Sequence, residues 1–181
     1  LDNTIAWYEN NGSQSFTKIT ISTGATAVIS VFAIDLDLDG DMDVLSASQN
    51  DDKIAWYEND GASDPSFTAN TITTSADGAS YLYAVDLDND GDIDIVSNAM
   101  YENKVYWFEN NGASDPSFST NILASTTSAP GGIHAVDVDS DGDIDVLNTM
   151  GDADKIVWYE NNGAADPSFS ANTVTSSADG A

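Results

Sequence analysis

Three nearly identical acidic stretches decide how this sequence is interpreted. They read Asp35-Leu-Asp-Leu-Asp-Gly-Asp-Met-Asp43, Asp86-Leu-Asp-Asn-Asp-Gly-Asp-Ile-Asp94 and Asp137-Val-Asp-Ser-Asp-Gly-Asp-Ile-Asp145. Each copy begins 51 residues after the one before it. Recurrence at a fixed period of this size is typical of a tandem repeat, in which each unit is one supersecondary element that packs on its neighbours.

A second marker follows the same period. It is an aromatic block that reads Trp-Tyr-Glu-Asn or Trp-Phe-Glu-Asn and begins at Trp7, Trp56, Trp107 and Trp158. Together the two markers divide a single repeat domain, residues 1–181, into a half repeat at 1–27 and three repeats at 28–78, 79–129 and 130–181.

Every unit contains four short runs rich in β-branched and aromatic residues, and no window shows a sustained helical period. In the second unit these runs are 81–85, 93–97, 104–109 and 118–123. An Asn-Gly or Asp-Gly pair follows each aromatic run, which predicts a tight hairpin turn. The fold class we predict is all-β. The chain would contain about 3.5 tandem repeats, each a four-stranded antiparallel blade of a β-propeller. These blades would form a segment of a longer propeller.

The acidic stretches predict metal binding. Carboxylates a few Å apart repel by roughly 1 to 4 kcal/mol per pair, and the chain has only 4 Lys and Arg residues against 31 acidic ones. A divalent cation would supply the missing positive charge. In the first copy Asp35, Asp37 and Asp39 converge, Gly40 permits the bend, the Asp41 carbonyl adds an oxygen and Asp43 closes the site.

An all-oxygen site in a flexible loop favours Ca²⁺ over Zn²⁺ or copper, and Mg²⁺ demands stricter geometry. The alternative is a solvated acidic turn without metal. We predict three calcium sites, with ligands from Asp35, Asp37, Asp39, Asp41 and Asp43; from Asp86, Asp88, Asp90, Asp92 and Asp94; and from Asp137, Asp139, Asp141, Asp143 and Asp145.

The stretches 33–44, 84–95 and 135–146 combine an Ala-x-Asp strand with Asp-x-Asp-x-Asp-Gly-Asp-x-Asp-Ile/Val. This pattern resembles the FG-GAP/VCBS-type repeat family. The resemblance implies a calcium-loaded β-propeller of the integrin-like kind, in which each loop joins the innermost strand of a blade to the second strand. It also implies that the family's calcium ligands fall on the aspartates named above.

Composition excludes several functions. A net charge of −27 opposes binding to nucleic acid or to an anionic membrane, and no apolar run is long enough for membrane insertion. Cysteine is absent, and the single histidine, His134, occupies the position of Phe32 and Tyr83 in the sister units, which indicates packing. We therefore expect no enzyme activity.

The aromatic strand of the second unit offers another candidate site. Alternation places Ile54, Trp56 and Glu58 on one face and Ala55 and Tyr57 on the other. Packing between blades is the favoured interpretation, and a shallow sugar site lined by Trp and Glu is the alternative.

The predicted function is an extracellular or cell-surface module, stabilised by calcium, for adhesion or for binding a glycan or surface protein. One alternative is a structural repeat or filament segment whose partners are neighbouring repeats or copies of itself. Another is an accessory domain of a secreted carbohydrate-active enzyme, because relatives of this kind accompany such enzymes. The fold resemblance alone does not decide among these.

Overall fold

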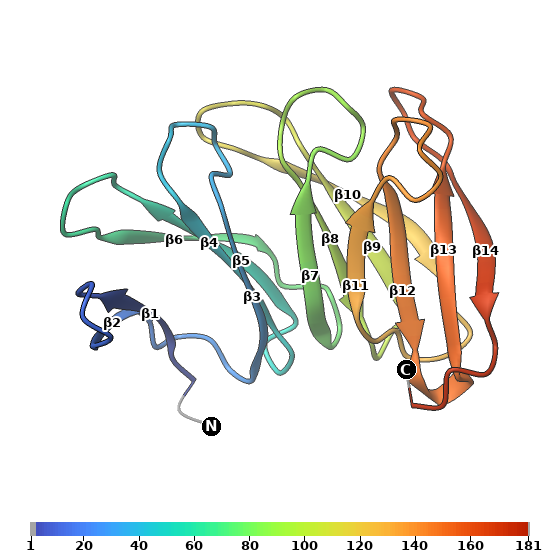
Figure 1. The fold of residues 1–181 in the computed structure, drawn as a ribbon, viewed down its shortest axis with the longest axis horizontal. Coiled ribbons are helices and arrows are strands. Elements are labelled where there is room, and N and C mark those ends of the chain that lie inside the picture. The colour runs from blue at the N-terminus through green and yellow to red at the C-terminus, as the bar shows by residue number, and fades with distance from the viewer. Residues whose placement is uncertain (1–2, 181) are drawn as a thin grey trace.

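The computed structural model describes residues 3–180 and is built from one two-stranded and three four-stranded antiparallel sheets, which fan out side by side (Figure 1). We call them the half-blade, blade 1, blade 2 and blade 3. Their strands are β1 (Ile5–Asn10) and β2 (Phe16–Ser22); β3 (Val28–Ile34), β4 (Asp43–Ser48), β5 (Lys53–Asn59) and β6 (Phe67–Thr73); β7 (Ala79–Val85), β8 (Asp94–Ala99), β9 (Lys104–Asn110) and β10 (Phe118–Ser125); β11 (Ile133–Val136), β12 (Asp145–Met150), β13 (Lys155–Asn161) and β14 (Phe169–Thr175).

Strands that follow one another in the chain are neighbours in each sheet, so every full blade is a four-stranded meander. The all-β prediction and the propeller-like repeat are therefore confirmed. Helical structure among the described residues is limited to a short 3₁₀ turn at Gly151–Ala153. None of the described helical structure is long and apolar enough to cross a membrane.

The hydrophobic core lies between the blades, because each sheet is apolar on both faces. Ile54 and Trp56 belong to the core shared with blade 2, whereas Ala55 and Tyr57 belong to the core shared with the half-blade. Alternation along β5 thus directs adjacent residues to opposite neighbours, as predicted. Complete burial of one large apolar side chain contributes roughly 1.5 to 3 kcal/mol, so the blades stabilise one another.

The first strands of the three full blades, β3, β7 and β11, lie next to one another (Figure 1). Their aromatic side chains form a row in which the rings of Phe32 and Tyr83 are 4.9 Å apart and those of Tyr83 and His134 are 4.7 Å apart. The Tyr83–His134 pair is edge-to-face, an arrangement that the ring quadrupoles favour. His134 therefore takes the predicted place in this row and contacts the Tyr83 ring, although its side chain is exposed.

The connection after each aromatic strand differs from the predicted tight turn. Residues 60–66 form a loop between β5 and β6, in which the Asp60 N–H donates to the Ser66 carbonyl at 3.1 Å. The Asp60 carboxylate accepts the backbone N–H of Ala62 at 3.2 Å and that of Ser66 at 3.0 Å. Gly61 does have the expected positive φ of 66°, but the side chain of Asp60 organises a longer loop.

Candidate metal centres

Each acidic stretch forms the loop between the first and second strands of a full blade. We call these aspartate loop 1 (35–43), aspartate loop 2 (86–94) and aspartate loop 3 (137–145). All three emerge along the same edge of the molecule, at the top of Figure 1. The fifth aspartate of each loop is the first residue of the following strand, so the sheet holds the end of the loop in place.

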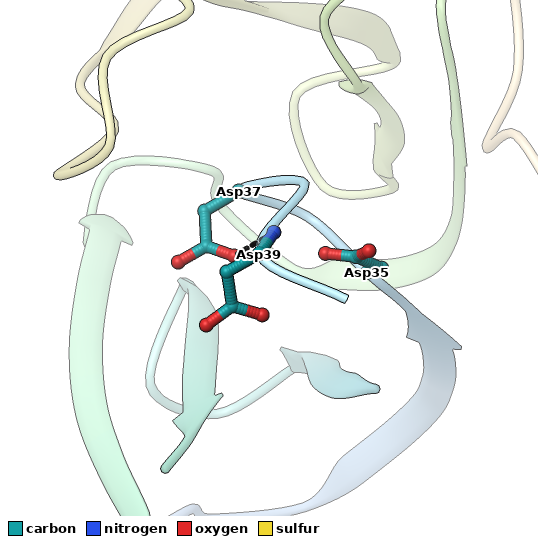
Figure 2. Close-up of side chains that lie close together, drawn as sticks. All are labelled: Asp35, Asp37 and Asp39. Carbon is teal, nitrogen blue, oxygen red and sulfur yellow. Dashed lines mark hydrogen bonds between the residues drawn. The ribbon is translucent and has the colours of Figure 1, made fainter. Parts of the chain in front are cut away.

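Aspartate loop 1 gathers three carboxylates. Asp35, Asp37 and Asp39 each offer an oxygen, and these oxygens lie within 4.8 Å of one another (Figure 2). The loop also closes on itself, since the Gly40 N–H donates to Asp35 Oδ2 at 3.0 Å. The corresponding side-chain triads in the other two loops are Asp86, Asp88 and Asp90, and Asp137, Asp139 and Asp145.

Two left-handed residues make this convergence possible. Leu38 has a φ of 60° and Gly40 a φ of 101°. The same pair recurs as Asn89 and Gly91 in aspartate loop 2. A left-handed conformation destabilises a non-glycine residue by about 1 kcal/mol or more. In loop 1 this residue is Leu38, whose side chain is 56% exposed.

The fifth aspartate anchors each loop to the blade. In loop 1, Asp43 is 1% exposed and accepts the backbone N–H of Leu36 at 3.1 Å and that of Asn59 at 2.8 Å. In loop 2, Asp94 is held in the same manner, and its burial raises the pKa to about 7. Burial also raises the pKa of Asp43. Burial therefore disfavours the ionised form of these carboxylates, and an adjacent cation would stabilise it.

The carboxylate of the fourth aspartate lies against a glycine rather than within the triad. In loop 1, a Cβ atom placed on Gly61 would collide with the carboxylate of Asp41. Gly112 stands in the same relation to Asp92, and Gly163 to Asp143. The backbone carbonyl of the fourth aspartate remains the oxygen that we predicted as a ligand. The close approach explains why glycine follows the aromatic block in the three full blades.

The residues present fit a hard divalent cation. Asp35 Oδ1 and Asp86 Oδ1 are buried and have no hydrogen-bond partner. Burial, with a further contribution from neighbouring carboxylates, raises the pKa of Asp37 and of Asp88. Every donor is an oxygen, the type that Ca²⁺ and Mg²⁺ prefer over Zn²⁺ or copper. A cation at each triad would satisfy the orphaned oxygens and offset the repulsion.

The asparagine that ends each aromatic block was not predicted as a functional residue. Asn59 donates its backbone N–H to Asp43 and its side-chain amide to the Met42 carbonyl, at 2.8 and 3.0 Å. Asn110 and Asn161 make the same two contacts in their own blades. The signal that could have identified them is recurrence, because asparagine ends all four blocks.

The tryptophans of the aromatic blocks serve mainly as packing residues. Trp56 is 2% exposed and Trp107 is 4% exposed. Each contacts the core shared with the next blade, where Phe118 packs beside Trp56 and Phe169 beside Trp107. Their ring faces are therefore covered by protein.

The fold and the three loops define a propeller-like repeat protein with oxygen-only candidate metal centres. The FG-GAP-like repeat model matches residues 2–46, 35–97 and 86–148, and the chain belongs to this family. This confirms the resemblance of the acidic stretches to FG-GAP-type repeats. A comparison with curated proteins finds no significant match.

One similar solved structure is described as the structural basis of specific recognition of non-reducing terminal N-acetylglucosamine by an Agrocybe aegerita lectin. The two chains superpose with a TM-score of 0.64 at 17% sequence identity, over 98% of this chain and 48% of the lectin chain. This chain thus spans about half the length of the lectin chain. At this identity the similarity shows a shared fold.

Proposed function

We propose that this protein is a calcium-stabilised extracellular binding module with a β-propeller-like fold. The observation that carries the proposal is the triad of converging carboxylates, found in all three aspartate loops, with buried oxygens that lack partners in loops 1 and 2. Calcium would supply positive charge to each triad and leave the loops ordered. The role is structural, since the loops hold no nucleophile paired with a base.

We propose an extracellular location because of the calcium affinity that we expect for these loops. Calcium loops of extracellular modules bind with dissociation constants of roughly 10⁻⁴ to 10⁻³ M. Sites of that affinity fill outside the cell and stay largely empty at cytosolic calcium concentrations. A module whose stability depends on such sites is therefore suited to secretion or to the cell surface.

We propose carbohydrate as the ligand class. A groove of about 300 Å³ lies between blades 1 and 2 and is lined by Asn70, Pro116, Phe118 and the buried Trp56. The Asn70 amide lies 3.5 Å from Glu58 Oε2. A mixed lining of polar and apolar groups suits a sugar, which presents both C–H faces and hydroxyl groups.

Two further observations support this ligand class. A related groove of about 310 Å³ recurs between the half-blade and blade 1, beside Trp7, Pro65 and Phe67. The lectin that shares this fold is described as recognising N-acetylglucosamine. Binding rather than catalysis is proposed, because the single histidine stacks in the aromatic row.

A glycan array tests the proposal. The protein should bind a defined set of glycans in calcium and lose binding in chelator. Asn70→Ala should weaken binding, whereas Asp152→Asn, a change at an exposed position in the 3₁₀ turn of blade 3, should not. Absence of binding to every glycan in calcium, with the protein folded, would contradict carbohydrate as the ligand.

A second candidate is a structural repeat that associates with copies of itself. It is favoured by the outer face of blade 3, where Leu147, Ile156 and Trp158 are only partly buried. Their counterparts in blade 1 include Leu45, which is completely buried beneath blade 2. Light scattering in calcium distinguishes the candidates, since concentration-dependent assembly supports this one and a monodisperse monomer opposes it.

A further inference from the structure

Asn161 of blade 3 contacts two aspartate loops at once. Its backbone N–H donates to Asp145 Oδ1 at 2.8 Å, in aspartate loop 3. Its side-chain amide donates to the carbonyl of Leu87 at 3.1 Å, in aspartate loop 2. Asn161 is 3% exposed and Leu87 is completely buried, so water does not readily replace this bond.

The bond between Asn161 and Leu87 is linked to the candidate metal site of aspartate loop 2. The Leu87 N–H donates to Asp94 Oδ2 at 3.2 Å. Asp94 and Asp145 are each 1% exposed. A buried series of hydrogen bonds therefore runs from Asp94 through Leu87 and Asn161 to Asp145, and in a medium of low dielectric each bond constrains the next.

A second contact joins the same two loops at the surface. The Asn89 side-chain amide in loop 2 donates to Asp143 Oδ1 in loop 3 at 3.2 Å. Loop 1 has Leu38 at the position of Asn89, and leucine has no amide to offer to loop 2. This surface contact is therefore specific to the pair formed by loops 2 and 3.

We propose that Asn161 is a positioning residue that couples calcium binding at aspartate loops 2 and 3. The inference rests on the proposed calcium sites and extends them. An ion at loop 2 orders the Leu87 carbonyl, which holds Asn161 and with it Asp145. The second ion then binds a loop that is already ordered, and the coupling is reciprocal.

Blade 1 provides a matched control. Asn59 makes the same contacts within its own blade, to Asp43 and to the Met42 carbonyl. The half-blade that precedes it contains no aspartate loop. Both alanine variants keep the backbone N–H that donates to the aspartate. Asn59→Ala therefore removes the local side-chain contact with the Met42 carbonyl alone, whereas Asn161→Ala removes the equivalent contact with Ile144 and the bond to loop 2.

Hydrogen–deuterium exchange of the full chain during a calcium titration tests the coupling, because peptides from each loop report separately. In Asn161→Ala the calcium midpoint for protection of residues 86–94 should rise about five-fold, the lower end of typical coupling. In Asn59→Ala only residues 35–43 should shift. An unchanged midpoint at 86–94 in Asn161→Ala overturns the coupling while leaving calcium binding intact. If calcium protects no loop of the wild-type protein, both the coupling and the proposed function fail.

If Asn161→Ala does not fold, an exchange of the residues at positions 89 and 143 offers a second test. Asn89→Asp alone places two carboxylates together and should uncouple the loops. Adding Asp143→Asn reverses the direction of the hydrogen bond and should restore the coupled midpoints. Failure of the double variant to recover would contradict the proposal.

Discussion

The backbone N–H of Asn110 donates to Asp94 Oδ1 at 2.8 Å and joins aspartate loop 2 to the aromatic strand of the same blade. The pairs Asn59–Asp43 and Asn161–Asp145 repeat this bond at the same length. The end of each loop is therefore positioned by the sheet itself. Such preorganisation lowers the ordering cost of binding an ion.

The buried charge of Asp94 predicts how stability depends on pH. Burial raises its pKa to about 7 in the folded metal-free protein, whereas an unfolded chain releases this proton near pH 4. Between these values the folded state binds more protons, so lowering the pH from 8 to 5.5 should raise the Tm of metal-free protein.

Calcium should reverse this trend, because protons and the cation compete for the same carboxylates. Thermal melts in chelator and in excess calcium, across this pH range, check both trends. A metal-free Tm that falls on acidification from pH 8 to 5.5 would be inconsistent with a desolvated Asp94.

Removal of one ligand should remove one site. Asp88 lies in the triad of loop 2, so Asp88→Ala should reduce the number of bound calcium ions from three to two in a calorimetric titration. Asp152→Asn changes charge at an exposed position in the 3₁₀ turn of blade 3, outside the aspartate loops, and should leave three. Retention of three ions by Asp88→Ala would exclude this residue as a required ligand.

The contact between Gly112 and Asp92 predicts a steric effect. Gly112→Ala places a methyl group against the Asp92 carboxylate, in addition to the strain of a φ of 64°. Gly12 has a similar φ of 75°, but the methyl group of Gly12→Ala would meet no atom within 4 Å. Gly12→Ala should cost about 1 kcal/mol of stability, and Gly112→Ala should cost more and weaken calcium binding at loop 2. Equal effects of the two variants on stability and calcium affinity would show that the contact is unimportant.

Packing between blades predicts unequal effects for two equivalent tryptophans. Trp107 is 4% exposed between blades 2 and 3, so Trp107→Ala should cost roughly 3 to 5 kcal/mol in the free energy of unfolding. Trp158 occupies the same position on the outer face of blade 3 and is only partly buried. Trp158→Ala should cost less. Denaturant unfolding measures both values, and a larger loss at Trp158 would indicate that this face is covered in solution.

The sequence predicted the blades because two markers recur at a fixed period and alternation directs Ile54 and Trp56 to one neighbour and Tyr57 to the other. It also predicted the triads of loops 1 and 2, since alternate residues of a tight loop face inward, whereas in loop 3 the triad contains Asp145 in place of Asp141. The anchoring role of Asn59 was not predicted, because its contact with Asp43 spans 16 residues and depends on strand pairing. The longer loop at Asp60 was not predicted, because it depends on the Asp60 carboxylate accepting the backbone N–H groups of Ala62 and Ser66.

Calcium binding to the folded chain is the central claim, and a calcium titration followed by calorimetry and thermal melting tests it most directly. We predict three bound ions with dissociation constants of roughly 10⁻⁴ to 10⁻³ M. The Tm should fall in chelator and recover when calcium is restored, because an ion that binds only the folded state stabilises it. No heat of binding together with an unchanged Tm in chelator would contradict the account.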